Sequence, residues 1–168
     1  MCMATQENAM EAFAGESQAN RKYQAFAEKA ESEGYKNIAR LFKAASEAEA
    51  IHAKKLLKTL GSIVSTKENL EKAVAGETHE YTEMYPQFVR EAEAEKKSDA
   101  LLAFTYAMKA EEVHAGLYKE ALKSLNAGQD MSNRTVWFCP VCGNIFLGQP
   151  PDKCPICNVF KKMFKEIQ

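Results

Sequence analysis

The stretch from residue 4 to residue 126 is dominated by residue types that favour helices. Alanine, glutamate, lysine, leucine and methionine recur through it, whereas glycine and proline are sparse. The pattern predicts long helices over residues 6–33, 35–60, 77–97 and 99–126, with a short helix at 68–75. Gly34, Gly61 and Gly128 suit helix ends, and Ser98 can cap the last helix. Two antiparallel pairs joined by a long crossover at 61–76 predict an all-α four-helix bundle.

Proline at position 86 falls inside the third predicted helix. Because proline lacks a backbone N–H and clashes with the preceding turn, we expect a kink or another irregularity there.

The composition changes after residue 127, where the polar segment GQDMSNRT precedes Trp137 and the last cysteines. We therefore expect a helical domain over residues 1–127, a linker over 128–135 and a small domain over 136–168. A segment as short as 136–168 cannot fold on a hydrophobic core alone. Its stability should come largely from a bound metal.

Two Cys-Pro-x-Cys pairs supply the ligands for that metal, within FCPVCGNIFLGQPPDKCPICNVF. They predict one ion held by Cys139, Cys142, Cys154 and Cys157. Zinc would make the site structural, whereas iron would make it an electron carrier. The spacing alone leaves both open. Cys2 is expected to be a free thiol without a function.

The charge balance argues against polyanionic partners. The chain holds 22 basic and 23 acidic residues, and the basic ones form no block, so neither nucleic acid nor an anionic membrane surface is expected. The first residues contain no apolar run of signal-peptide length, and no segment has the length of a membrane span. We therefore expect a cytoplasmic protein, in which paired cysteines bind metal rather than form disulfides.

Charged residues interrupt the apolar stripe of every long helix. The second helix places Glu49 and His52 among apolar residues, and the fourth places Glu111 and His114 there, each pair three residues apart. The first helix contributes Glu16, and the third contributes Glu77 and Glu80. His79, which turns away from its neighbours, is expected to be exposed.

Buried carboxylates repel one another and lose hydration, which costs several kcal/mol each unless something compensates. No matching set of inward lysines or arginines is present, so metal is the simplest compensation. Five carboxylates and two imidazoles suit a pair of octahedral first-row ions better than one tetrahedral zinc. One Glu from each of two helices plus Glu-x-x-His from the other two is the pattern of di-iron and di-manganese bundles. A single such pair would instead be interpreted as a surface pair.

Five segments together resemble the rubrerythrin family, in the same order along the chain. They are FAGESQAN at 13–20, EAEAIH at 47–52, GETHEYTEMYP at 76–86, AEEVH at 110–114 and the two cysteine knuckles. The resemblance implies a ferritin-like bundle with a non-haem di-iron site and a small, metal-stabilised, rubredoxin-like β/knuckle domain at the C-terminus, with one iron on four cysteines. Asn158 stands where glycine is usual after the second knuckle, and asparagine tolerates the positive φ needed there.

The resemblance also implies roles for the ligands. Glu49 and Glu111 would bridge two irons, Glu16 and Glu77 would bind at the ends, and His114 would hold one iron. His52 and Glu80 would be alternative ligands to the other iron. The tyrosines Tyr23 and Tyr85 would hydrogen-bond to ligating glutamates, although core packing is an equal alternative for both.

The activity implied is reduction of hydrogen peroxide to water, which protects against oxidative stress. Electrons would come from NAD(P)H through separate carriers, such as a rubredoxin or its reductase, and would enter through the iron on the four cysteines. The alternatives are a ferroxidase and a non-enzymatic protein with zinc on the cysteines. His114 lies about 18 Å before the end of its helix and the linker reaches at most about 30 Å. We therefore expect a head-to-tail homodimer, in which the small domain of one chain serves the bundle of the other.

Overall fold

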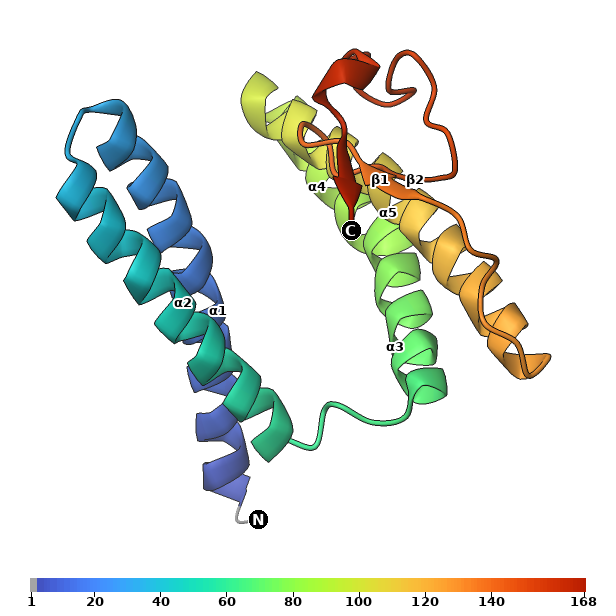
Figure 1. The fold of residues 1–168 in the computed structure, drawn as a ribbon, viewed down its shortest axis with the longest axis horizontal. Coiled ribbons are helices and arrows are strands. Elements are labelled where there is room, and N and C mark those ends of the chain that lie inside the picture. The colour runs from blue at the N-terminus through green and yellow to red at the C-terminus, as the bar shows by residue number, and fades with distance from the viewer. Residues whose placement is uncertain (1–2) are drawn as a thin grey trace. The chain divides into compact units, whose positions relative to one another are not determined.

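A computed structural model describes residues 3–168, so Cys2 lies outside the described part of the chain. The chain divides into two compact units, one ending at Val64 and the other comprising Ser65–Gln168. Each unit is described by itself below (Figure 1). Within residues 3–168, no helix is long and apolar enough to cross a membrane.

The first unit is a hairpin of two long helices, α1 (Met3–Ser32) and α2 (Lys36–Thr59). Gly34, at φ 85°, ends α1, and the N–H of Tyr35 donates to the carbonyl of Ala30 at 2.8 Å. Both helices agree with the predicted ranges to within three residues. Positive φ is favourable for glycine, which explains why the turn falls there.

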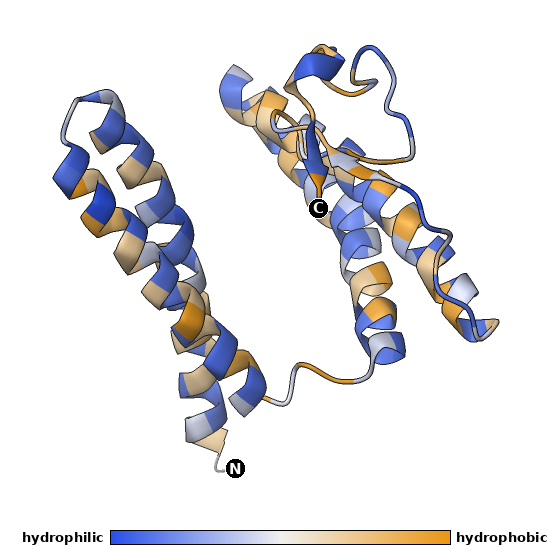
Figure 2. Cartoon of the chain, viewed as in Figure 1, coloured by the Kyte–Doolittle hydropathy of each residue, from blue (hydrophilic) through white to orange (hydrophobic). Residues whose placement is uncertain are grey.

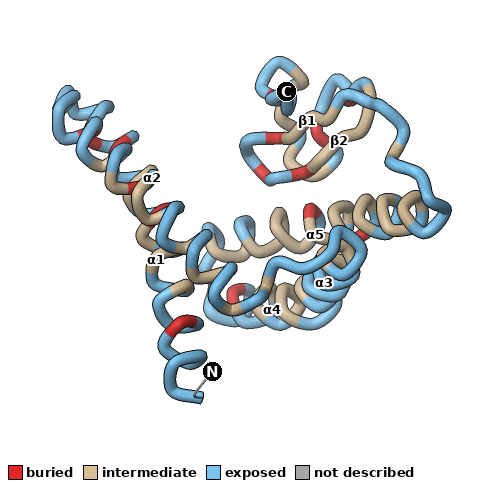
Figure 3. The backbone as a smooth tube through the Cα atoms, turned by 60° about the horizontal axis from the view of Figure 1, so that its bottom comes forward, coloured by how far each residue is buried: buried red, intermediate tan, exposed pale blue. Residues whose placement is uncertain are grey.

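Small residues dominate the buried positions of this hairpin (Figure 3), namely Ala9, Asn20, Ala27, Ala30, Ala39 and Ser46. Asn20 Nδ2 donates to the Ser46 carbonyl at 2.8 Å and to Ser46 Oγ at 2.9 Å, and Ser46 Oγ donates back to the Asn20 carbonyl at 2.9 Å. Each buried hydrogen bond stabilises the fold by about 1 kcal/mol. These three hydrogen bonds between Asn20 and Ser46 define the register of α1 against α2.

In the second unit, the predicted short helix and the predicted third helix form one continuous helical element. The α-helix α3 (Thr66–His79) leads directly into the π-helical turn η1 (Glu80–Met84) and then into α4 (Tyr85–Ala94). Ser65 begins α3 with a capping box, in which its side chain accepts from the Glu68 N–H and the Glu68 side chain accepts from the Ser65 N–H. The separate helix at 68–75 is wrong, because Gly76 lowers helix stability by only about 1 kcal/mol and does not break it.

The irregularity predicted around Pro86 is present as the π-turn that precedes it. The N–H of Tyr85 donates to the carbonyl of Glu80, five residues back. Thr82 Oγ1 donates to the Thr78 carbonyl at 2.6 Å within the same turn. One extra residue per turn rotates every side chain that follows, so η1 sets the direction of Glu80 relative to α4.

The last long helix is α5 (Ser98–Asn126). Ser98 is its first residue and not its cap: Lys97 occupies the cap position and makes no side-chain capping bond. The turn between α4 and α5 instead uses Lys96 at φ 56°, with the Lys97 N–H donating to the Ala92 carbonyl at 2.9 Å. The Ser98 prediction is therefore wrong, because the backbone of the turn closes without it.

Residues 136–168 form a small sheet with two cysteine knuckles. The strands β1 (Val136–Phe138), β2 (Ile145–Leu147) and β3 (Lys165–Ile167) are antiparallel in the order β2-β1-β3, and a 3₁₀ turn, η2 (Lys161–Met163), precedes β3. Phe164 and three of the knuckle cysteines are buried in its core. The predicted fold class, long helices followed by a small rubredoxin-like domain, is confirmed (Figure 2 colours both parts by hydropathy).

Candidate metal centres

The first unit brings three predicted ligands together, which we call the N-terminal cluster. Glu16 of α1 meets Glu49 and His52 of α2, with one ligand atom from each within 4.8 Å of the others. His52 Nδ1 lies 2.8 Å from Glu49 Oε2 and 3.8 Å from Glu16 Oε1. A hydrogen bond with the Glu49 side chain, followed by burial, raises the pKa of Glu16. Two carboxylates that share a site in this way resist double ionisation without a cation.

The second unit holds an equivalent group, the C-terminal cluster, made by Glu77 of α3 with Glu111 and His114 of α5. His114 Nδ1 lies 2.7 Å from Glu111 Oε2 and 3.7 Å from Glu77 Oε2. All three side chains are about four-fifths buried, at 17–21 % exposed. Burial, then a hydrogen bond with Glu111, raises the pKa of Glu77 to about 8. Glu77 Oε2 is buried without a hydrogen-bond partner among the described residues.

Glu80 lies beside this cluster without being part of its tight group. It is the first residue of η1. Burial and then the negative charge of Glu111 raise its pKa, which indicates that the two carboxylates are close. His79 is exposed as predicted, with its ring 3.3 Å from Glu83 and 60 % of its side chain accessible. Within residues 77–80, Glu77 and Glu80 therefore lie at the cluster, whereas His79 faces solvent.

Both clusters have the properties of metal sites. Their carboxylate oxygens lie 2.7–3.8 Å from Nδ1 of His52 or His114, and one buried carboxylate oxygen, Glu77 Oε2, has no hydrogen-bond partner among the described residues. Each histidine directs Nδ1 towards the carboxylates. For His114, Nε2 is engaged elsewhere, so that Nδ1 carries the free lone pair that a metal needs. Carboxylate oxygens with imidazole suit iron or manganese.

Each predicted tyrosine heads a group of three aromatic rings. Tyr23 lies 6.2 Å and 6.1 Å, between ring centroids, from Phe26 and Phe42. Tyr85 lies 6.1 Å and 6.4 Å from Phe88 and Phe104. Burial, and then the charges of Glu111, Glu80 and Glu77, raise the pKa of the Tyr85 hydroxyl. Tyr85 therefore combines ring packing with proximity to the carboxylates, whereas Tyr23 packs against the rings of Phe26 and Phe42.

The four cysteines of the small domain converge, with all four sulfurs within 4.8 Å of one another. Cys139 and Cys157 lie 3.5 Å apart at Sγ, as do Cys142 and Cys154, and all four are free thiols. The sulfurs are too far apart for disulfides and close to the spacing of a tetrahedral metal site. Burial raises the pKa of Cys142, so its thiolate requires a cation.

The two knuckles have matched backbones. The Gly143 N–H donates to the Cys139 carbonyl, and the Asn158 N–H donates to the Cys154 carbonyl, each at 2.9 Å. Gly143 has φ 79° and Asn158 has φ 60°. Asparagine therefore adopts the positive φ expected of it, and the second knuckle keeps its shape without glycine.

The small domain contacts α5 of its own chain at the C-terminal cluster. His114 Nε2 donates to the carbonyl of Gly143, in the first knuckle, at 3.0 Å. Tyr106 of α5 packs against the buried core of the cysteines, and Arg134 of the linker forms an ion pair with Glu120 of α5. The sequence did not identify Tyr106, Glu120 or Arg134, because nothing in their spacing marks a contact between distant segments.

The return to His114 of the same chain, which the length of the linker makes difficult, is present in the structure. The chain reverses after α5, and the Arg134–Glu120 pair holds the linker along the helix on its way back to His114. The head-to-tail homodimer itself stays a prediction.

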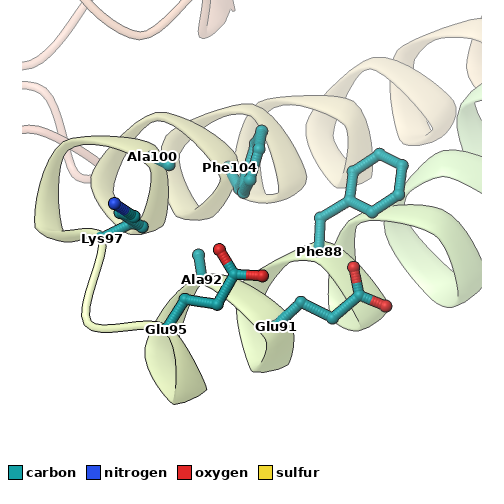
Figure 4. Close-up of a pocket in the computed structure, with 7 residues that line it drawn as sticks. All are labelled: Phe88, Glu91, Ala92, Glu95, Lys97, Ala100 and Phe104. Carbon is teal, nitrogen blue, oxygen red and sulfur yellow. The ribbon is translucent and has the colours of Figure 1, made fainter.

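A pocket of about 290 Å³ lies between α4 and α5, lined by Phe88, Glu91, Ala92, Glu95, Lys97, Ala100 and Phe104 (Figure 4). None of the predicted ligands lines it. The candidate centres are therefore the two carboxylate clusters and the cysteine site.

Comparison with known proteins agrees with this arrangement. The profile of the rubrerythrin family matches residues 7–122, and that of the rubrerythrin rubredoxin-like domain matches residues 137–165. Rubrerythrin-2 of Clostridium acetobutylicum is 38 % identical, over 92 % of this chain and 91 % of the relative. Nigerythrin of Nitratidesulfovibrio vulgaris is 39 % identical, over 92 % of this chain and 82 % of the relative.

Solved structures of nigerythrin also match, at 37 % identity, covering 97 % of this chain and 86 % of theirs. The TM-score is 0.58 for the mixed-valence state and 0.59 for the fully reduced, all-ferrous state. The ligand clusters, the four-cysteine site and these matches together show that the chain belongs to the rubrerythrin family.

Proposed function

We propose that this protein is a non-haem di-iron peroxidase that reduces hydrogen peroxide to water and protects the cell against oxidative stress. The observation that carries the proposal is the hydrogen bond from His114 to Gly143. It connects a residue of the C-terminal cluster to the knuckle of the cysteine site through one contact. A four-cysteine site used only for stability would need no such connection.

Seven side chains would hold two irons. In this assignment Glu49 and Glu111 would be shared between the irons, and Glu16 and Glu77 would each bind one of them. His114 would hold one iron, while His52 and Glu80 would be alternative ligands to the other. The tight grouping of three ligands in each cluster supports the proposal. So does the position of Glu80 on a π-turn, beside its cluster.

The reaction H₂O₂ + 2e⁻ + 2H⁺ → 2H₂O sets what the site must provide. Iron at this site would supply two electrons to the O–O bond. Carboxylic acids or water near the site would supply the two protons. Tyr85, close to three of the carboxylates, would hydrogen-bond to a ligand and limit stray oxidation.

Electrons would reach the site through a single iron on Cys139, Cys142, Cys154 and Cys157. They would come from NAD(P)H through separate carriers, the last of them a protein such as a rubredoxin or its reductase. We propose a cytoplasmic location, because the free thiols of the cysteine site require a reducing compartment.

Anaerobic purification followed by metal analysis and a visible spectrum tests the cofactors. We expect three irons per chain and a red, reducible centre. Colourless protein with zinc on the cysteines would contradict the electron-transfer part of the proposal.

Stopped-flow mixing of the reduced protein with peroxide or with oxygen tests the reaction. Fast oxidation by peroxide and slow oxidation by oxygen support the peroxidase. The reverse order would identify a ferroxidase, and the absence of any redox change would identify a non-enzymatic metal-binding protein.

A further inference from the structure

The two knuckles of the small domain have different surroundings. The first, residues 139–144, faces α5 through the Gly143 carbonyl and His114. The second, residues 154–157, is followed by Phe160, whose ring is 56 % exposed. Of the four cysteines, Cys157 in this second knuckle is the one that is not fully buried. If electrons leave towards His114 beside the first knuckle, the second knuckle is the exposed approach to the metal.

Around the second knuckle, an apolar surface is bordered by lysines. We call it the second-knuckle face: Lys153, Phe160, Lys161, Lys162 and Met163. Lys153 Nζ lies 4.9 Å from the centroid of the Phe160 ring, and these two residues form a β-bridge across the knuckle. Met163 is 47 % exposed. Phe160, Lys161 and Lys162, together with Asp152, line a hollow of about 380 Å³.

None of these lysines forms an ion pair with an acidic side chain of the described residues, so their charges are largely uncompensated. Lys161 Nζ donates to the neutral Gln149 side chain at 3.2 Å, and Lys153 lies over an aromatic ring. Residues 136–168 contain four lysines against two acidic residues, although the whole chain has more acidic than basic residues. Positive charge is therefore concentrated on the small domain of a chain that is otherwise acidic.

We propose that the second-knuckle face is the docking site for an acidic electron-donor protein, which transfers its electron near Cys157. This inference rests on the proposed function and specifies the partner's surface. The exposed ring of Phe160 would enter an apolar patch on the donor, and the lysines would attract its acidic rim. Complementary charge speeds the encounter of redox proteins, whereas the short apolar contact keeps the complex transient.

Stopped-flow reduction of the iron on the four cysteines by a reduced rubredoxin that is rich in acidic residues tests the proposal. In the double variant Lys161→Glu/Lys162→Glu, the second-order rate constant at low salt should fall by about ten-fold or more. The steep decrease of the wild-type rate with added salt should also disappear. Phe160→Ala should lower the rate about five-fold and keep the salt dependence.

The matched control is Lys67→Glu/Lys72→Glu, which makes the same change of charge at two exposed positions in the first two turns of α3, within the same unit as the small domain. Its rate should stay within about two-fold of wild type, since steering depends on charge near the docking site. The visible spectrum of the four-cysteine iron shows whether each variant keeps its fold. Reduction by photoreduced riboflavin, a small uncharged donor, should be equal in all variants.

The proposal is overturned if Lys161→Glu/Lys162→Glu reacts with the rubredoxin as wild type does, or if the α3 control loses as much rate. Failure of the proposed function is a separate result. In that case the reduced protein would not react with peroxide, although the rubredoxin would still reduce the four-cysteine iron in a lysine-dependent way.

Discussion

His114 connects two metal sites through its two ring nitrogens: Nδ1 lies 2.7 Å from Glu111 Oε2, and Nε2 donates to the Gly143 carbonyl at 3.0 Å. The carbonyl defines the tautomer, because it can only accept a hydrogen bond. The ring therefore carries a proton on the knuckle side, and Nδ1 is the nitrogen that faces the carboxylates. This arrangement gives the clearest structural basis for testing how the two centres communicate.

Tyr106 should position the small domain for electron transfer. It packs against the buried cysteine core from α5, about two helical turns before His114. Tyr106→Ala should slow electron transfer from the four-cysteine iron to the C-terminal cluster by about ten-fold, because the docked position becomes less populated. Tyr106→Phe should retain the rate, since the ring makes the contact. Rapid-mixing spectroscopy of the four-cysteine iron measures both, and oxidation of the pre-reduced protein by peroxide should be unchanged.

The Arg134–Glu120 ion pair should have a small effect on the rate of electron transfer from the four-cysteine iron to the C-terminal cluster. Both side chains are partly exposed, at 37 % and 48 %, and such pairs stabilise by about 0–1 kcal/mol. Glu120→Arg or Arg134→Glu alone should slow electron transfer a few-fold at low salt, whereas the double exchange should restore it. If the exchanged pair is as slow as the single variants, the ion pair does not hold the linker.

The metal-free protein should lose stability as the pH rises from about 5 to about 8. The pKa of Glu77 is about 8 in the folded chain and near 4.5 when exposed. The folded state therefore binds a proton that the unfolded state has released, so a higher pH favours unfolding until Glu77 ionises above its folded pKa. Thermal unfolding of metal-free protein should show a falling midpoint over this range. The Glu77→Gln variant should show a smaller fall.

Asn20→Ala should destabilise the hairpin of α1 and α2. It removes the two hydrogen bonds that the Asn20 amide donates to the Ser46 carbonyl and hydroxyl, which costs about 1–3 kcal/mol. Chemical denaturation of metal-free protein, followed by far-UV circular dichroism, measures this loss. Arg21→Ala is the control, because Arg21 is an exposed neighbour whose side chain bonds to Gln24 on the surface. Equal stability of the two variants would mean that the Asn20–Ser46 hydrogen bonds do not stabilise the hairpin.

Removing the metal from the cysteine site should unfold residues 136–168 and leave the helices intact. Trp137, the single tryptophan, packs against the cysteine core and reports on it. After chelation its fluorescence should shift to the red, while the helical circular dichroism stays nearly unchanged. Asn158→Gly should respond as wild type does. Unchanged Trp137 fluorescence after complete metal removal would mean that the sheet folds without metal.

The positions of the long helices could be predicted because their signals are local. Helix-forming residues with glycine at the ends place α1 and α2 to within three residues. The same reasoning was less accurate at two other helix starts: a capping box begins α3 at Thr66 rather than at residue 68, and Lys97 rather than Ser98 occupies the cap position of α5. Whether a serine caps a helix depends on the backbone conformation at that residue, which the sequence does not reveal.

The ligands were predictable for a different reason. Glu49 with His52, and Glu111 with His114, are charged residues in apolar stripes, and burial without compensation is too costly to be accidental. The sequence by itself therefore determined the helices, the ligand types and the two knuckles, since each follows from local spacing and residue chemistry. The tertiary structure alone decided that Glu80 sits on a π-turn, that Glu77 Oε2 is orphaned, and that Gly143 returns to His114 of its own chain. Those contacts depend on how the backbone turns and packs, and residues far apart in sequence carry no local signal of meeting.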